Sequence, residues 1–397
     1  MIYNMSDEKD IYSQLGVSSK KEDVHKALEN INKGLFPGAF CKIMEDIRMR
    51  DKYCSIFHSD GAGTKSNLAY MYYRETNDIS VFRGIVRDAM VMNIDDILCV
   101  GATGNYFLSN NIGRNGHYIS GEIIAEIINE YQSYSSKLTE LGLKVTLCGG
   151  ETADVGDIVK TLLVDASMFT TMERKDVIDA SNIQAGDVIL GLASDGKSIY
   201  EDEYNSGIGS NGLTLARHGV LAHNYYEKYP ECFDKETDEK LLFFGKYLLT
   251  DKLPGLNLNI GKSLLSPTRT YAPVLIEILR HFRKDIHGII QNTGGGQTKV
   301  LNFSEGIKYI KNNLFKIPKI FEIIQNSSET PWREMYQVFN MGNRLEIYCS
   351  ESNAKKIMEI CRKFSIESKI IGFCEKSPYI KKNVVEIKSE FGSFEYN

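Results

Sequence analysis

The chain has 397 residues, more than one compact core usually holds, so its length predicts two domains of roughly 150–200 residues each. Apolar residues make up 42% and charged residues 25%, which excludes disordered, collagenous and fibrous proteins. The formal charge of −5, from 47 basic against 52 acidic residues, argues against a nucleic-acid or anionic-membrane partner.

The cysteines and the amino terminus predict a cytoplasmic protein. Eight cysteines are spread along the chain without zinc-type spacing, and most lie in apolar runs, as expected of reduced thiols. The first ten residues lack the apolar core of a signal peptide, and no stretch reaches the roughly 18 apolar residues of a membrane span.

The first half of the chain is predicted to hold a mobile or docking arm, residues 1–35, followed by a domain at 36–178. In the arm, only Lys21–Asn32 has a helical pattern. The domain is expected to contain three strands and two long helices, at Tyr53–His58, Val81–Val100, Gly121–Leu141, Lys144–Cys148 and Ile158–Met172.

A polar connector, Asp176–Gly186, leads into a predicted second domain at 179–397. Strands and helices alternate again in it, so the predicted fold class is α/β or α+β. The polar segment Lys197–Ser206 is expected to be either a solvated loop or a lid. The expected elements are Asp187–Ala193, Leu213–Arg217, Asp238–Leu248, Tyr271–Phe282, Ile286–Ile290, Leu345–Cys349, Ser352–Phe364 and Ser368–Phe373.

Four glycine clusters lie at element boundaries. The first, Asp60-Gly61-Ala62-Gly63-Thr64-Lys65, fails the P-loop pattern because Thr64 separates Gly63 from Lys65. Glycines nevertheless let backbone N–H groups approach an anion, and a nearby lysine adds positive charge; the alternative is a tight turn with a solvated lysine. The other clusters are Gly149–Asp154, Gly207–Gly212 and Thr293–Lys299. The second of these is a literal GxGxxG, but it does not directly follow a strand, which disfavours dinucleotide binding.

Three carboxylates, Asp88, Asp95 and Asp96, lie in an otherwise apolar helical run. They form either a polar stripe facing solvent or a group neutralised by a cation. Together with Asp60 and Glu151 beside the glycine clusters, they suit Mg²⁺ bound to a polyphosphate. No Ser-His-Asp or Cys-His constellation is legible, and the seven histidines are scattered.

Seven motifs stand in the order seen in the phosphoribosylformylglycinamidine cyclo-ligase (aminoimidazole ribonucleotide synthetase) family, which the chain resembles from about residue 12 to near its carboxyl terminus. They are Ser59–Lys65, Asp95-Asp96, Gly149–Ala153, Ser210–Gly212, Leu265–Tyr271, Thr293–Gly296 and Met335–Asn340. The resemblance implies a homodimer whose amino-terminal domains form a shared β-barrel with ATP near the interface. It also implies a carboxyl-terminal α/β sandwich, with the substrate in the cleft between the domains.

The implied reaction is the ATP-dependent ring closure of formylglycinamidine ribonucleotide to aminoimidazole ribonucleotide in purine biosynthesis, which would make the chain a ligase. The substrate supplies both nucleophiles: its formyl oxygen takes the γ-phosphoryl group, and a nitrogen then closes the ring and expels phosphate. The protein therefore needs only to position the reactants and neutralise charge.

The resemblance carries roles over to particular residues. Catalytic roles are expected for Lys65, Asp96 and Asn211. The expected ATP-binding residues are Asp60, Gly61, Gly63, Thr64, Lys65, Gly149, Gly150, Glu151 and Thr152. Substrate binding is expected of Ser210, Asn211, Gly212, Arg269, Thr293, Gly294 and Gly295, and Mg²⁺ binding of Asp60, Asp88, Asp96 and Glu151.

Two departures keep alternatives open. Gly209 and Gln291 stand where many family members carry histidine, so no general base is named. One alternative is a selenophosphate-synthetase-like enzyme, for which Cys41 would be the reactive thiol; the other is a non-catalytic nucleotide-binding paralogue.

Overall fold

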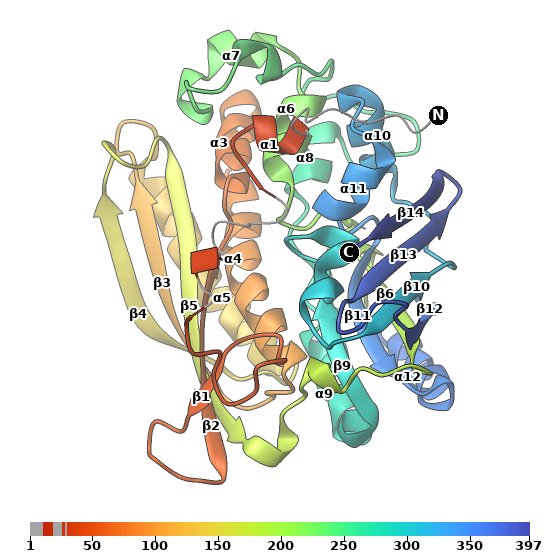
Figure 1. Cartoon of the computed structure of the whole chain (residues 1–397). Helices are drawn as coiled ribbons and strands as arrows, with labels where there is room; N and C mark the ends of the chain where they lie inside the picture. The colour runs from red at the N-terminus through yellow and green to blue at the C-terminus, as the bar shows by residue number, and fades with distance from the viewer. Residues whose placement is uncertain (1–10, 19–25, 28–29) are drawn as a thin grey trace.

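The computed structural model describes residues 11–18, 26–27 and 30–397, and these form two α/β units side by side (Figure 1). One is built on a five-stranded sheet and the other on a seven-stranded sheet. The predicted two-domain α/β class is therefore confirmed. Most of the helical pattern predicted at Lys21–Asn32 lies outside the described residues.

The first sheet has the strand order β1-β2-β5-β3-β4. All its pairings are antiparallel except β3 with β4, which is parallel. Its strands are β1 (Ile43–Glu45), β2 (Tyr53–Gly61), β3 (Tyr106–Arg114), β4 (Val145–Asp154) and β5 (Leu162–Glu173). Burial alternates along the whole of β5, so one face of the sheet is packed and the other is open. The sheet of a single chain has edges at β1 and β4, so the shared barrel stays a prediction.

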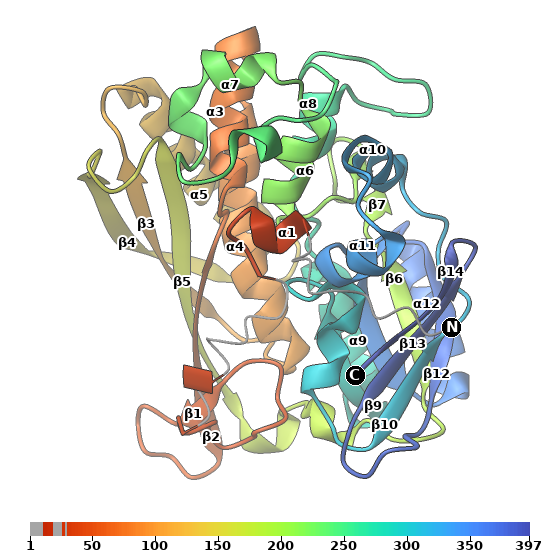
Figure 2. The ribbon, with the colours of Figure 1, turned by 45° about the horizontal axis from the view of Figure 1, so that its top comes forward.

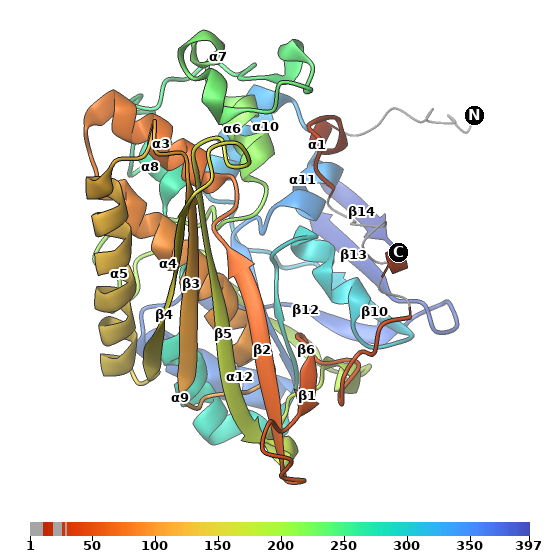
Figure 3. The same ribbon diagram turned by 90° about the vertical axis from the view of Figure 1, so that its left-hand side faces the viewer.

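Helix α4 (Val81–Cys99) lies between the two sheets (Figure 2). It contacts β2 and β5 on one side, and β9 (Ile286–Gln291) and α9 (Ala272–Phe282) on the other. It is buried over almost its whole length because it packs between the two sheets, and its polar residues Asp88, Asn93, Asp95 and Asp96 are buried with it. Helix α5 (Gly121–Glu140) packs beside it and contacts β4. In Figure 3 the strands β2, β5, β3 and β4 stand in front, with α4 behind them.

The second sheet has the order β14-β13-β10-β12-β6-β11-β9. Helices α9 and α12 contact each other, and α12 packs on β6, β11 and β12. Its strands are β6 (Val188–Ala193), β9 (Ile286–Gln291), β10 (Ile307–Lys311), β11 (Asn343–Cys349), β12 (Ser368–Lys376), β13 (Val384–Ser389) and β14 (Gly392–Tyr396), and a separate pair is formed by β7 (Asp195–Gly196) and β8 (Asn205–Ser206). The remaining α-helices are α1 (Ile11–Gln14), α3 (Lys65–Thr76), α6 (Leu213–Val220), α7 (Asn224–Lys228), α8 (Ile260–Leu265), α9 (Ala272–Phe282), α10 (Lys319–Ser328), α11 (Trp332–Val338) and α12 (Glu351–Lys363).

Two sequence-based expectations are wrong. The expected helix Asp238–Leu248 contains only a short 3-10 turn at Glu239–Leu241. Residues Gly149–Asp154 are not a loop, because they continue strand β4 alongside β3.

All eight cysteines lie in the described ranges and all are free thiols. Seven are buried, and Cys148, on the edge strand β4, is exposed. Within the described residues, no helix has the length and apolar character needed to cross a membrane.

Candidate active site

The first glycine cluster brings the two domains into contact. Strand β2 ends at Gly61, helix α3 begins at Lys65, and Gly63 between them has a positive φ of 57° with open space where a Cβ would lie. From the second domain, the Ser210 hydroxyl donates to the carbonyl oxygen of Ala62 at 3.1 Å. The cluster and the predicted substrate motif Ser210–Gly212 therefore meet, although they are far apart in the sequence.

Lys65 is fully buried and bonded within the protein. Its Nζ lies 3.0 Å and 2.9 Å from the two carboxylate oxygens of Asp88, and it donates to the carbonyl oxygens of Gly209 and Ser266 at 3.0 Å and 2.6 Å. Burial lowers the pKa of the Lys65 ammonium, and the Asp88 carboxylate opposes this effect. A phosphate contact by Lys65 would require these bonds to break.

Asp88 is held from both sides. Besides Lys65, it accepts hydrogen bonds from the backbone N–H and the hydroxyl of Thr268, at 2.7 Å and 2.6 Å. Its neighbour on the same helix, Asp95, accepts from the Thr270 hydroxyl and the Tyr271 N–H. Neither carboxylate faces solvent, so a solvated polar stripe on α4 is ruled out. The predicted motif Leu265–Tyr271 instead anchors the two acids of the first domain.

Asp96 is different, because one of its carboxylate oxygens has no partner. Its Oδ2 lies 3.5 Å from Nε2 of His58, whereas Oδ1 is buried without a hydrogen-bond partner in the described part of the chain. Burial raises the pKa of Asp96 to about 6; His58 and Lys299 oppose this effect, and Asp60 adds to it. Asp60 and Asp96 are therefore close enough to interact. The unpaired Oδ1 of Asp96 suits a divalent cation bound between the two carboxylates.

Glu151 does not join Asp60 and Asp96. Strand pairing places Gly61, Asp165, Asn111 and Glu151 in one row across β2, β5, β3 and β4. Three strand spacings of about 4.8 Å put Glu151 about 14 Å from Gly61, too far to share one ion within a chain. Among the residues that the structure describes, no three His, Cys, Asp or Glu side chains gather to hold a metal.

Sequence reasoning missed Asp165, which lies beside Asp60 in an open depression of about 500 Å³. Burial, and next the Asp60 carboxylate, raise the pKa of Asp165. Its Oδ1 occupies the place that a Cβ of Gly61 would take, 1.6 Å away, so Gly61 must be glycine for this pairing. An acid at an outward position of a strand rich in β-branched residues was the available signal. The predicted ATP residues Gly149, Gly150 and Thr152 lie two strands further along.

The second-domain loops are fixed by Asn340, from the last of the seven motifs. The side-chain amide of Asn340 donates to the carbonyl oxygen of Gly207 at 2.8 Å. The backbone carbonyl oxygen of Asn340 accepts from the side-chain amide of Gln297 at 2.6 Å. Gln297 follows the predicted substrate residues Thr293, Gly294 and Gly295. Asn340 therefore holds both the loop that contains Gly207 and the loop that contains Gln297. Asn211 lies half-buried at the same junction.

Arg269, which is expected to bind the substrate, uses its guanidinium nitrogens in hydrogen bonds within the protein. Its Nε and Nη2 donate to both oxygens of Glu201 at 2.9 Å and 2.6 Å, and its Nη1 donates to the carbonyl oxygens of Ala193 and Asp195. The segment Lys197–Ser206 is thereby anchored, so it is not simply a solvated loop. Gln291, which stands in the place of a family histidine, is fully buried, and its amide has no partner among the described residues.

Comparison with known proteins gives a domain class first. Residues 41–172 match the family described as AIR synthase related protein, N-terminal domain. Relatives that match most of the chain then share the name of one particular enzyme. A phosphoribosylformylglycinamidine cyclo-ligase of Methanococcus vannielii is 29% identical over 384 residues, covering 96% of this chain and 91% of the relative. Cyclo-ligases of the same name from Methanocaldococcus jannaschii and Alkaliphilus metalliredigens are each 28% identical, covering 81% and 85% of this chain and 78% and 84% of theirs. The predicted resemblance is confirmed.

Among solved structures, phosphoribosylformylglycinamidine synthase II of Thermotoga maritima aligns at 16% identity with a TM-score of 0.48. The alignment covers 87% of this chain and 44% of that one, so the chain spans less than half the length of that protein.

Proposed function

We propose that the chain is a phosphoribosylformylglycinamidine cyclo-ligase of purine biosynthesis, acting in the cytoplasm. It converts formylglycinamidine ribonucleotide and ATP to aminoimidazole ribonucleotide, ADP and phosphate. The observation that carries the proposal is the extent of the match, because relatives of this one name align with up to 96% of the chain, through both sheets.

The chemistry needs no protein nucleophile. The formyl oxygen of the substrate attacks the γ-phosphorus, and the bond from that phosphorus to the β–γ bridging oxygen breaks as ADP leaves. The amidine-side nitrogen then attacks the activated carbon, and phosphate departs with the former formyl oxygen. What the protein must supply is alignment of the reactants and neutralisation of the phosphate charge.

Asp96 and Asp60 are the residues best suited to hold Mg²⁺. The unpaired Oδ1 of Asp96 supports this assignment, and two carboxylates with water and phosphate oxygens satisfy this ion. Bound there, Mg²⁺ would neutralise phosphate charge. Asp88 serves instead to hold Lys65, and Glu151 belongs to the ATP site rather than to that ion.

ATP is expected at the turn Gly63–Lys65, where backbone N–H groups lie at the amino end of the twelve-residue helix α3. The substrate is expected in the adjoining cleft, against Ser210–Gly212 and Thr293–Gly295. Both loops are held by Asn340, which supports a preformed site.

We propose a domain boundary between residues 178 and 179, with residues 1–35 as the amino-terminal arm.

A homodimer accounts for the open face of the first sheet. Phe57, Phe169 and Phe107 are register partners across β2, β5 and β3, and the outer two are 58% and 44% exposed. An apolar row of this kind on an uncovered sheet suits burial against a second copy. The face would then become the wall of a shared barrel, with ATP close to the interface.

One assay separates the proposal from its alternatives. Purified protein is mixed with formylglycinamidine ribonucleotide, ATP and Mg²⁺, and phosphate release and the aminoimidazole product are followed together. Turnover of both supports the proposal, and Asp96→Asn should reduce it strongly. Turnover with selenide alone would indicate the selenophosphate reaction, and ATP binding without turnover would indicate a non-catalytic paralogue.

A further inference from the structure

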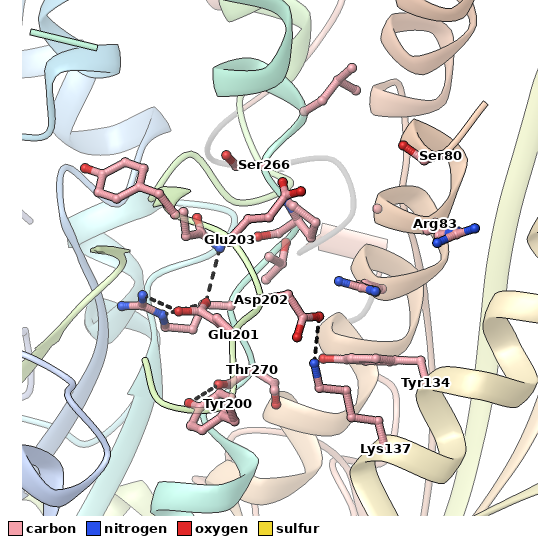
Figure 4. Close-up of a pocket in the computed structure, with 18 of the residues that line it drawn as sticks. Ser80, Arg83, Tyr134, Lys137, Tyr200, Glu201, Asp202, Glu203, Ser266 and Thr270 are labelled. Atoms are coloured by element: carbon pink, nitrogen blue, oxygen red, sulfur yellow. Dashed lines mark hydrogen bonds and ion pairs between the residues drawn. The ribbon is translucent and has the colours of Figure 1, made fainter. Parts of the chain in front are cut away.

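A separate cavity of about 320 Å³ lies between the domains, at the amino-terminal end of α4 (Figure 4). Its walls come from α4, α5, the anchored segment at 200–205 and the stretch at 265–270. Small-molecule sites usually measure about 300–1,000 Å³, so its size suits a small metabolite. None of the residues assigned to ATP or Mg²⁺ lines it, and only Arg269, bonded to Glu201, comes from the predicted substrate set.

Arg87 contributes its guanidinium group to the α4 wall of this cavity. Its Nε donates to Glu130 at 2.6 Å, and its guanidinium lies over the Tyr134 ring, 5.3 Å from the centroid. Its side chain is 28% exposed, and within the described residues its hydrogen bond comes from Nε and none comes from the two terminal amino groups. A guanidinium held by one nitrogen keeps a planar pair of donors that matches a carboxylate or a phosphate.

Two of the three acidic residues on the opposite wall, Glu201 and Asp202, are bound to cations that also line the cavity, which weakens their effect on Arg87. Glu201 is bound to Arg269. Asp202 pairs with Lys137 at 2.8 Å, in the contact drawn in Figure 4, and it also acts on Arg87 at longer range. Lys262 is bound to Asp78 at 3.1 Å, so Glu203 is only its weaker neighbour. The Asp202 and Lys137 side chains are 67% and 30% exposed, so this pair can open at little cost when a ligand binds.

The rest of the lining is apolar enough for the body of a ligand. Tyr134 and Leu141 come from α5 and its end, and Leu265 and Pro267 from the second domain. We propose that this cavity is a second ligand site, for a small molecule with a phosphate or carboxylate group on an aromatic or apolar body. The oxyanion binds the terminal nitrogens of Arg87, with Lys137 nearby, and the body packs between Tyr134 and Pro267.

The cavity shares a wall with the candidate active site, but no residue expected to bind ATP or Mg²⁺ lines it. Thr268 and Thr270 line the cavity, and the same two residues bind Asp88 and Asp95. A ligand here is therefore expected to bind together with Mg²⁺ and ATP and not to compete with them. This separates the site from any phosphate subsite of the nucleotide.

Calorimetry with simple probes tests the proposal. The probes are phenyl phosphate, benzoate and phenol, titrated into the full chain with and without ATP and Mg²⁺. We expect phenyl phosphate or benzoate to bind and phenol not to bind; the tighter of the two identifies the oxyanion. Arg87→Gln should weaken binding at least about tenfold, because it removes a charge-assisted pair of hydrogen bonds. Lys137→Gln, on the surface, should weaken it about threefold.

The matched control is Arg280→Gln, which removes an arginine that is likewise paired with a glutamate, Glu277, but whose side chain is 64% exposed on α9, away from the cavity lining. It should leave probe binding unchanged, and circular dichroism should show each variant folded. If Arg87→Gln is unfolded, the Lys137→Gln result and a crystal soaked with the probe decide the question. Equal binding of phenol, unchanged affinity in both cavity variants, or displacement of the probe by ATP and Mg²⁺ would overturn the proposal.

Discussion

Replacement of Asp88 by asparagine is expected to destabilise the protein strongly, even though the change is nearly isosteric. Asp88 and Lys65 are both fully buried and bind each other at 2.9–3.0 Å. Asparagine could still accept from Thr268, but its Nδ2 group would then face the Lys65 ammonium, so two donors would meet and the buried cation would lose its counter-charge.

Removing one partner of a buried ion pair costs about 3–5 kcal/mol of unfolding free energy. Because native domains are stable by only about 5–15 kcal/mol, Asp88→Asn should lose about a fifth of its stability or more. Urea denaturation followed by circular dichroism measures the loss, with Asp96→Asn on the same helix as the control. The control should stay folded, because the Oδ1 atom of Asp96 has no hydrogen-bond partner to lose in the described part of the chain.

The double variant Lys65→Met, Asp88→Asn tests the cause. It removes both charges together, so no buried ion is left without its counter-charge. At least half of the lost stability should return. A single Asp88→Asn variant as stable as the wild type, but with Mg²⁺-dependent turnover abolished, would refute this reasoning and return Asp88 to the metal site.

Three further predictions concern single positions. In the absence of Mg²⁺ and ATP, Asp96→Asn should match the wild type at pH 4 and exceed its stability by up to about 3 kcal/mol at pH 8. Burial raises the pKa of Asp96 from 3.8 to about 6, so the wild type loses stability as pH rises through this range and asparagine does not; urea midpoints at both pH values check it. Gly150→Ala should cost about 1–3 kcal/mol, since its Cβ would lie 2.5 Å from a backbone oxygen of β3, whereas Gly121→Ala, with open space, should cost nothing in a thermal melt. Phe107→Lys should shift sedimentation towards the monomer, while Ile380→Lys, at a 94% exposed position elsewhere, should not; a dimer that survives Phe107→Lys would exclude this face as the interface.

The elements that sequence predicts best are those whose own residues determine them. Helices α4 and α5 lie within one residue of their expected ends, because long apolar periodicity and a Ser120 cap mark them locally. Strand β4 continues through Gly149–Asp154 because β3 supplies a neighbour, and no local signal carries that information. The helix expected at 238–248 was wrong, because Gly245 and Tyr247 form isolated bridges with Ala222 and Leu221, a pairing that the local sequence does not encode.

The candidate site shows the same division. The order of the motifs predicts a site shared by the glycine clusters of the two domains. The contact between Ser210 and Ala62 joins two of these clusters. Which acid pairs with which cation is decided by tertiary contacts that spacing along α4 does not encode. Asp88 is bound to Lys65, Asp96 retains an unpaired oxygen, and Arg269 is held by Glu201.

The uneven exposure of the thiols makes the native sequence convenient for spectroscopy. Cys148 lies on an edge strand three residues before Glu151, and the other seven sulfur atoms are shielded by the interior. A maleimide fluorophore should therefore attach at one place without any engineered mutation. Its emission would report nucleotide binding near Glu151. It would also report the approach of a second copy of the chain to strand β4.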